Sequence, residues 1–141
     1  MNGMNFEFFV KLSPSEDSGF IVTCPDLPQL ITQGESVNDT LIAASDALEE
    51  VLAGFMIRNS NIPIAKFNEG FRISPSPWFA VKLAFYICFI GSDLTKSELA
   101  KRLGVDEKEV RRMLDPKYPS KLPRLAEGIA FFGKQLRISL D

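Results

Sequence analysis

The sequence predicts an α+β fold, in which strands and one long helix form the first half and helices form almost all of the second. Three observations support this prediction. Short segments rich in Phe and β-branched residues alternate with turn residues up to residue 34. Apolar residues then recur at helical spacing from residue 37 to residue 55. After a Ser-Pro-Ser-Pro run at residues 74–77, the apolar segments are typical of helices.

Four short strands and one helix are predicted in the first half, in the order βββαβ. Residues 5–12 and 20–24 form a hairpin, and residues 29–33 form a third strand after two prolines that cannot donate to a ladder. Ser36 is predicted to cap a helix of about twenty residues, whose apolar stripe indicates that it lies on a sheet. Residues 71–73 form the fourth strand. We place the domain boundary between residues 74 and 75, which gives domains 1–74 and 75–141.

The second half is predicted to contain four helices, at residues 78–90, 96–103, 107–114 and 122–132. The first lies in a 14-residue apolar run that includes Lys82. A membrane span needs roughly 20 apolar residues, so this run is predicted to be a buried helix. Gly133 is expected to end the last helix at its C′ position.

Residues 136–140 alternate between apolar and polar side chains, which predicts a terminal strand. A single strand has two unpaired edges. We therefore expect it to pair with the same strand of a second copy, through Leu136, Ile138 and Leu140. This predicts a homodimer, and leaves open a tetramer.

Charge is distributed unevenly along the chain. Residues 1–91 carry a net charge of −5, and residues 92–141 carry +3. This asymmetry suggests two surfaces with different partners. The alternative is chance variation among solvated charges.

The residue types that are missing argue against several kinds of chemistry. The chain has no histidine and no Cys-x-x-Cys pair, which argues against a structural zinc site and removes Ser-His and Cys-His nucleophile pairs. We therefore expect no metal, no cofactor and no enzymatic activity. Cys24 and Cys88 are expected to be reduced thiols of a cytoplasmic protein, because no secretory signal is evident at the N-terminus.

Residues 94–114 fit the pattern of a helix-turn-helix. Ala100 is small where two helices cross closely, and Gly104 is expected to adopt the left-handed conformation that ends the first helix. Val105 is expected to fill the corner, and Asp106 to cap the second helix. The spacing from Ala100 to Gly104 to Val110 is typical of the helix-turn-helix family, with a plain helical hairpin as the alternative.

If this prediction holds, the helix at 107–114 lies in the major groove of DNA. Arginine can bond guanine bidentately, and lysine or arginine also neutralises phosphate. The N-terminus of the preceding helix suits a phosphate contact. The alternative for each side chain is a solvated surface residue. The predicted DNA-binding residues are Lys96, Ser97, Glu107, Lys108, Arg111, Arg112, Lys117, Tyr118, Ser120 and Lys121.

Residues 19–36 contain a recognisable sequence pattern: a glycine, a strand, Pro-Asp-x-Pro, and then Thr-Gln-Gly-Glu-Ser before an Ala-rich acidic helix. This pattern resembles the signature of HicB antitoxins, although many relatives have Gly where this chain has Gln29. Lys-Leu-x-x-Leu at residues 121–125 and Phe-Gly-Lys-x-Leu at residues 132–136 resemble the HicB subgroup with a helix-turn-helix tail. The resemblance covers nearly the whole chain.

The resemblance implies a degenerate RNase H-like first domain without the catalytic carboxylates. That domain would bind and block a HicA-type toxin, a small mRNA-cleaving ribonuclease. The tail would bind operator double-stranded DNA and repress the operon of both proteins. An acidic module suits a basic RNA-binding toxin by electrostatic complementarity. The candidate toxin-binding residues are Asp17, Asp26, Glu35, Asp39 and Asp46.

Two alternatives stay open. The first is a helix-turn-helix transcription regulator whose first domain senses a small molecule or has only a structural role. The second is an RNase H-like nuclease, because Glu7 on a strand and Asp46 on the helix could converge on one pocket with other carboxylates. If these carboxylates have no catalytic role, they form a solvated acidic face.

Overall fold

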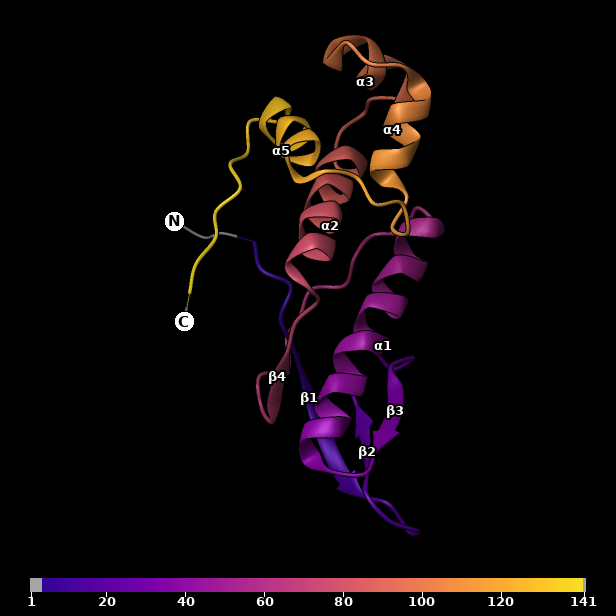
Figure 1. Ribbon diagram of the computed structural model, residues 1–141, viewed down its shortest axis with the longest axis vertical. Helices are drawn as coiled ribbons and strands as arrows, with labels where there is room; N and C mark the ends of the chain where they lie inside the picture. The colour runs from indigo at the N-terminus through magenta and orange to yellow at the C-terminus, as the bar shows by residue number, and fades with distance from the viewer. Residues whose placement is uncertain (1–3, 141) are drawn as a thin grey trace. The chain divides into compact units, whose positions relative to one another are not determined.

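The computed structural model describes residues 4–140, and its ribbon is shown in Figure 1. The predicted α+β class is confirmed, and the βββαβ order is found at the start of the chain. The chain divides into two compact units: residues up to 54 with residues 62–76, and residues 55–61 with residues from 77 onward. The elements are β1 (Phe8–Pro14), β2 (Phe20–Thr23), β3 (Ile31–Gly34), α1 (Val37–Ile57), β4 (Phe71–Ile73), α2 (Pro77–Ile90), α3 (Lys96–Leu103), α4 (Glu107–Leu114) and α5 (Leu122–Phe131).

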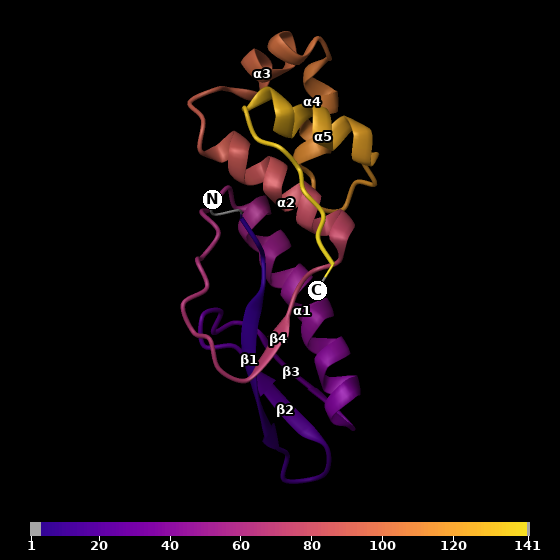
Figure 2. The ribbon, with the colours of Figure 1, turned by 90° about the vertical axis from the view of Figure 1, so that its left-hand side faces the viewer.

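The first unit contains a four-stranded antiparallel sheet with the strand order β3-β2-β1-β4. Side chains alternate between the two faces of a strand, and Phe8, Val10 and Val22 are buried on the same face. Figures 1 and 2 both show α1 running alongside the sheet. Its buried residues Ala44 and Leu48 lie one turn apart, as the predicted apolar stripe requires.

Strand bounds differ from the predicted ones at the hairpin and at β3. β1 begins at Phe8 and continues to Pro14, because Pro14 still pairs with Phe20 of β2. β3 begins two residues later than predicted, at Ile31. The reason is a pair of consecutive turns: Leu27 N–H donates to the Cys24 carbonyl at 3.1 Å, and Leu30 N–H to the Leu27 carbonyl at 2.9 Å.

The start of α1 is packed tightly against the hairpin. Ser36 Oγ accepts the Asp39 N–H at 3.0 Å, which confirms the predicted N-cap. A Cβ on Gly34 would lie 2.6 Å from the Thr40 backbone nitrogen, and a Cβ on Gly19 would overlap the Gly34 carbonyl oxygen. Glycine at these two positions therefore lets the hairpin turn, the end of β3 and the start of α1 lie in direct contact.

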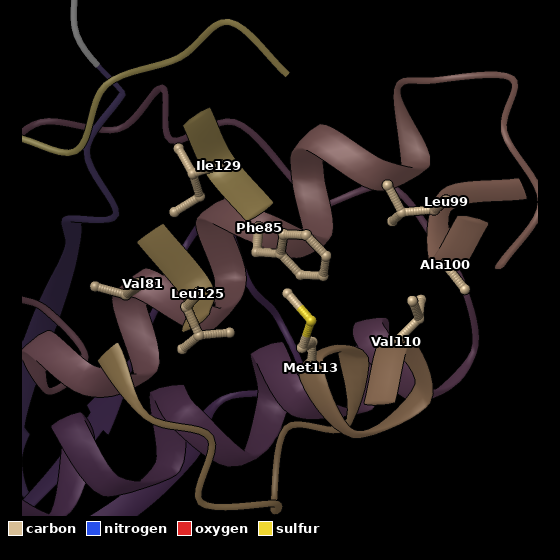
Figure 3. Close-up of a cluster of buried hydrophobic side chains, with 8 residues drawn as sticks. All are labelled: Val81, Phe85, Leu99, Ala100, Val110, Met113, Leu125 and Ile129. Atoms are coloured by element: carbon tan, nitrogen blue, oxygen red, sulfur yellow. The ribbon is translucent and has the colours of Figure 1, made fainter. Parts of the chain in front are cut away.

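The second unit is built from helices around one apolar cluster, shown in Figure 3. Phe85 of α2 and Met113 of α4 point toward each other at its centre. Gly128 lets α5 approach this pair, since a Cβ there would lie 2.5 Å from the Phe85 ring and 2.9 Å from Met113 Cε. The buried members of the cluster are Val81, Phe85, Leu99, Ala100, Val110, Met113, Leu125 and Ile129.

The end of the chain differs from the prediction. α5 ends at Phe131, and Gly133 follows with φ +77°, in the left-handed region expected for it. The predicted strand at 136–140 is not formed in this single chain, where residues 134–140 have no strand to pair with. Leu136 packs against the apolar cluster of its own unit, whereas Ile138 and Leu140 are 81% and 97% exposed.

The apolar run that carries Lys82 forms α2, as predicted, and its side chains after Pro77 are buried or partly buried. Within residues 4–140, no helix combines the length and the apolar character that crossing a membrane requires. Cys24 and Cys88 are both free thiols, and burial raises the pKa of each above its ordinary value.

Candidate functional site

Helices α3 and α4 have the predicted bounds, and both begin at a capped residue. Thr95 Oγ1 accepts the Glu98 N–H at 3.1 Å, and Glu98 Oε1 accepts the Thr95 N–H at 2.9 Å, a reciprocal capping box. These hydrogen bonds from Thr95 hold the pKa of Glu98 below its ordinary value. The sequence prediction missed this cap, although Thr-x-x-Glu before a helix is its known signal.

The turn between α3 and α4 has the predicted geometry. Gly104 has φ 72° and ψ 31°, and its N–H is directed to the Ala100 and Lys101 carbonyls. Asp106 Oδ1 accepts the Glu109 N–H at 2.8 Å and so caps α4. Val105 packs against the apolar cluster, in the corner position expected for it. The two short helices are therefore held by contacts within and beside the turn.

The side of α4 opposite the core carries charged side chains. Lys108 and Arg111 are exposed, and Arg111 Nη1 lies 2.8 Å from Glu107 Oε1. This is an i,i+4 ion pair at the surface, and such pairs contribute only about 0.3–0.5 kcal/mol. Arg111 can therefore exchange Glu107 for a stronger anionic partner at little cost.

A residue of α4 and a residue of the segment that follows it form a cation–π pair. The Arg112 guanidinium lies 5.2 Å from the centre of the Tyr118 ring. Ser120 is only 8% exposed; its Oγ donates to the Arg112 carbonyl at 3.3 Å, and its own carbonyl accepts the Trp78 indole N–H at 2.9 Å. Ser120 thus holds the segment in place, while Tyr118 lies at the surface.

Six of the ten predicted DNA-binding residues line two open pockets. One, of about 430 Å³, is lined by Arg112, Tyr118, Ser120 and Lys121. Another, of about 340 Å³, is lined by Lys96 and Arg111. The other four, none of them buried, lie along the same two helices and the same segment: Ser97, Glu107, Lys108 and Lys117.

Lys82 of α2 is completely buried beside the end of α4. Its Nζ donates to the carbonyl oxygens of Arg112 at 2.7 Å, Met113 at 3.4 Å and Asp115 at 2.6 Å. Burial lowers the pKa of Lys82 to about 8, and the carboxylates of Asp115 and Glu109 oppose that change. The sequence prediction assigned this lysine no role; its one signal was a cation inside an apolar run.

The division into units sharpens the charge asymmetry. The first unit contains 10 acidic and 3 basic residues, a net charge of −7. The second contains 8 acidic and 13 basic residues, a net charge of +5. Helix α1 contributes four carboxylates and no basic residue to the acidic unit.

The five candidate toxin-binding carboxylates have different environments. Asp26 Oδ2 accepts the N–H groups of Lys66 and Phe67, both at 2.9 Å, and so holds the segment that precedes β4. Glu35 Oε2 lies 3.5 Å from the Ser18 hydroxyl. The remaining three are exposed on the hairpin turn and on α1: Asp17, Asp39 and Asp46.

Of the two carboxylates of the nuclease alternative, Glu7 lies immediately before β1, just outside the strand expected for it, and Asp46 lies on α1. Glu7 Oε2 is 3.2 Å from Arg72 Nη1, on the neighbouring strand β4. Asp46 is exposed on α1. Over residues 4–140, the structure contains no group of three His, Cys, Asp or Glu side chains placed to hold a metal ion.

Residues 7–70 match a family model described as a HicB-like antitoxin of bacterial toxin–antitoxin systems. Antitoxin HicB 1 of Photorhabdus laumondii is 31% identical over 137 residues, which cover 97% of this chain and 88% of that protein. Antitoxin HicB of Escherichia coli K12 is 29% identical over 92% of this chain and 95% of its own length. Antitoxin HicB of Pseudomonas fluorescens is 26% identical over 95% and 94%. These similarities extend over both units.

Proposed function

Because the chain belongs to the HicB family of antitoxins, we propose that it binds and inhibits a HicA-type mRNA-cleaving toxin and represses the operon of both proteins. Membership of this family implies an antitoxin role in a toxin–antitoxin system. We assign toxin binding to the first unit and operator binding to the second. In this proposal the protein acts stoichiometrically, by covering its partner, and not as an enzyme.

The observation that carries the DNA-binding part is the α3–α4 pair with its left-handed turn at Gly104. Two helices joined by such a turn, with a basic outer surface on the second helix, are the parts of a DNA-binding helix-turn-helix. We infer that α4 lies in the major groove. Arg111 and Arg112 then reach bases or phosphates, and Lys96 approaches the backbone from the start of α3.

Support for toxin binding comes from charge. A ribonuclease that binds mRNA needs a basic surface, and a partner with a net charge of −7 is electrostatically complementary to it. Exposed carboxylates such as Asp39 and Asp46 of α1 suit that contact. Asp26 has a different role in this proposal, because its carboxylate is bonded within the unit.

We further propose that the second unit forms a homodimer through residues 136–140. Ile138 and Leu140 are apolar side chains left almost fully exposed in the single chain, and pairing with a second copy would cover them. A two-fold dimer would place two recognition helices about 34 Å apart, on one face of a palindromic operator.

The proposal is tested by changing Arg111 and Arg112 to Ala together. We expect binding to a duplex from the promoter of the protein's own operon to be lost in a gel-shift assay, because the substitutions remove two positive charges from α4. Growth of cells that express the neighbouring toxin gene should still be rescued. The matched control, Lys66→Ala with Arg72→Ala, removes two cations from the first unit and should bind the duplex normally.

Two outcomes would contradict parts of the proposal. If the Arg111 and Arg112 variant loses both activities while it remains folded, the assignment of one activity to each unit is wrong. If the unaltered protein binds the duplex but rescues no cells from a neighbouring toxin, a transcription regulator with a ligand-sensing or structural first unit is favoured instead.

A further inference from the structure

The buried lysine of α2, Lys82, donates hydrogen bonds to backbone carbonyls at the end of α4. We propose that Lys82 is a positioning residue for DNA binding, which sets the end of α4 and the segment at 115–121 in the orientation that the operator requires. This inference rests on the proposed function, in which α4 enters the major groove.

Lys82 completes hydrogen bonds at the end of α4. The last carbonyls of a helix have no partner within it. Lys82 Nζ donates to two carbonyls of the last turn, Arg112 at 2.7 Å and Met113 at 3.4 Å, and to the carbonyl of the C-cap residue Asp115 at 2.6 Å. The ammonium charge also lies at the negative end of the helix dipole. One side chain therefore fixes where α4 ends.

Helix α2 also contacts the segment beyond α4. Trp78 lies four residues before Lys82 and so on the same side of α2. Its indole N–H donates to the Ser120 carbonyl at 2.9 Å, and Lys82 Nζ lies 5.8 Å from the centre of the Tyr118 ring. Helix α2 thus holds both ends of the stretch that presents Arg112 and Tyr118.

Packing alone does not require a lysine at this buried position. A methionine of similar volume would fill the same space without the cost of burying a charge, and such replacements are often neutral or stabilising. What methionine cannot supply is a donor for three carbonyls. The distinct contribution of Lys82 is thus the fixed geometry around Arg112, which lowers the ordering cost when DNA is bound.

The experiment compares Lys82→Met with the unaltered full-length protein, using a duplex from the promoter of its own operon. Affinity is measured over a range of salt concentrations, at a temperature where both proteins are fully folded. We expect affinity to fall about tenfold and the slope of log K against log salt to become shallower by about 1, because phosphate contacts are lost. Lys134→Met, the same change at an exposed lysine, should alter neither quantity.

The slope separates positioning from stability. A variant that is only less folded would shift the line in parallel, whereas a misplaced contact changes its slope. If Lys82→Met does not fold, Trp78→Phe keeps an aromatic ring and removes only the donor to Ser120, and it should give a smaller effect of the same kind. A folded variant of either type with unchanged affinity and slope overturns the inference. A wild-type protein that fails to bind the duplex refutes the proposed function itself.

Discussion

In the first unit, residues of the family signature make contacts within the unit, whereas α3 and α4 of the second unit expose charged side chains to solvent. Gly19 and Gly34 permit backbone contact, and Asp26 holds the segment before β4. In α4, Met113 faces the core while Lys108 and Arg111 remain exposed. The signature residues of the first unit thus stabilise its fold. The α3–α4 pair of the second unit both stabilises a fold and presents a charged surface.

This difference has a consequence for mutagenesis. Changes to the signature of the first unit should lower stability before they alter recognition. Changes to the outer surface of the second unit should alter recognition first, as proposed for Arg111 and Arg112.

The largest effect is expected for Gly34→Ala. The added Cβ would meet backbone atoms of Thr40, which cannot move without displacing the start of α1. We expect the free energy of unfolding of the first unit to fall by about 3 kcal/mol, measured by urea denaturation. Operator binding by the second unit should persist. A stable Gly34→Ala protein would show that the contact between β3 and α1 is less tight than described.

A smaller effect is expected for Asp26→Ala. Two backbone N–H groups, of Lys66 and Phe67, lose a charged acceptor, which should cost about 2 kcal/mol of unfolding free energy. Toxin affinity of the folded variant should be nearly unchanged when it is measured by calorimetry. The comparison is Asp46→Asn at an exposed site, where we expect unchanged stability and slower toxin association at low salt. A loss of toxin affinity at full stability in Asp26→Ala would place Asp26 in the interface.

The last effect, which is small per pH unit, is a pH dependence that comes from Lys82. Its pKa is about 8 in the folded protein and ordinarily 10.5, so between these pH values the unfolded chain binds more protons. The unfolding free energy of the wild type, relative to Lys82→Met, should therefore rise with pH in this window, by at most about 1.4 kcal/mol per unit. Burial raises the pKa of Tyr86, but that residue is common to both proteins. A difference that stays constant from pH 7 to 10 would contradict a buried ammonium group.

Prediction from sequence succeeded best where the decisive contacts are short in range. The bounds of α3 and α4 were predicted correctly, because Gly104 and Asp106 act on residues a few positions away. The strand bounds were less accurate, because pairing partners such as Pro14 and Phe20 decide where a strand ends. The terminal strand at 136–140 is not formed in the single chain, and its pairing with a second copy stays a prediction.

The sequence by itself determined the order of the elements, the turn between α3 and α4, and the opposite charges of the two halves. Only the tertiary structure decided what Lys82, Asp26 and Ser120 do. Lys82 and Asp26 bond to backbone groups 30 to 41 positions away along the chain. The Ser120 hydroxyl donates to the nearby Arg112 carbonyl, and the Ser120 backbone carbonyl accepts the N–H of the distant Trp78 indole. A local pattern determines the backbone conformation around it, but a polar side chain gains its role from the distant groups that folding brings within reach.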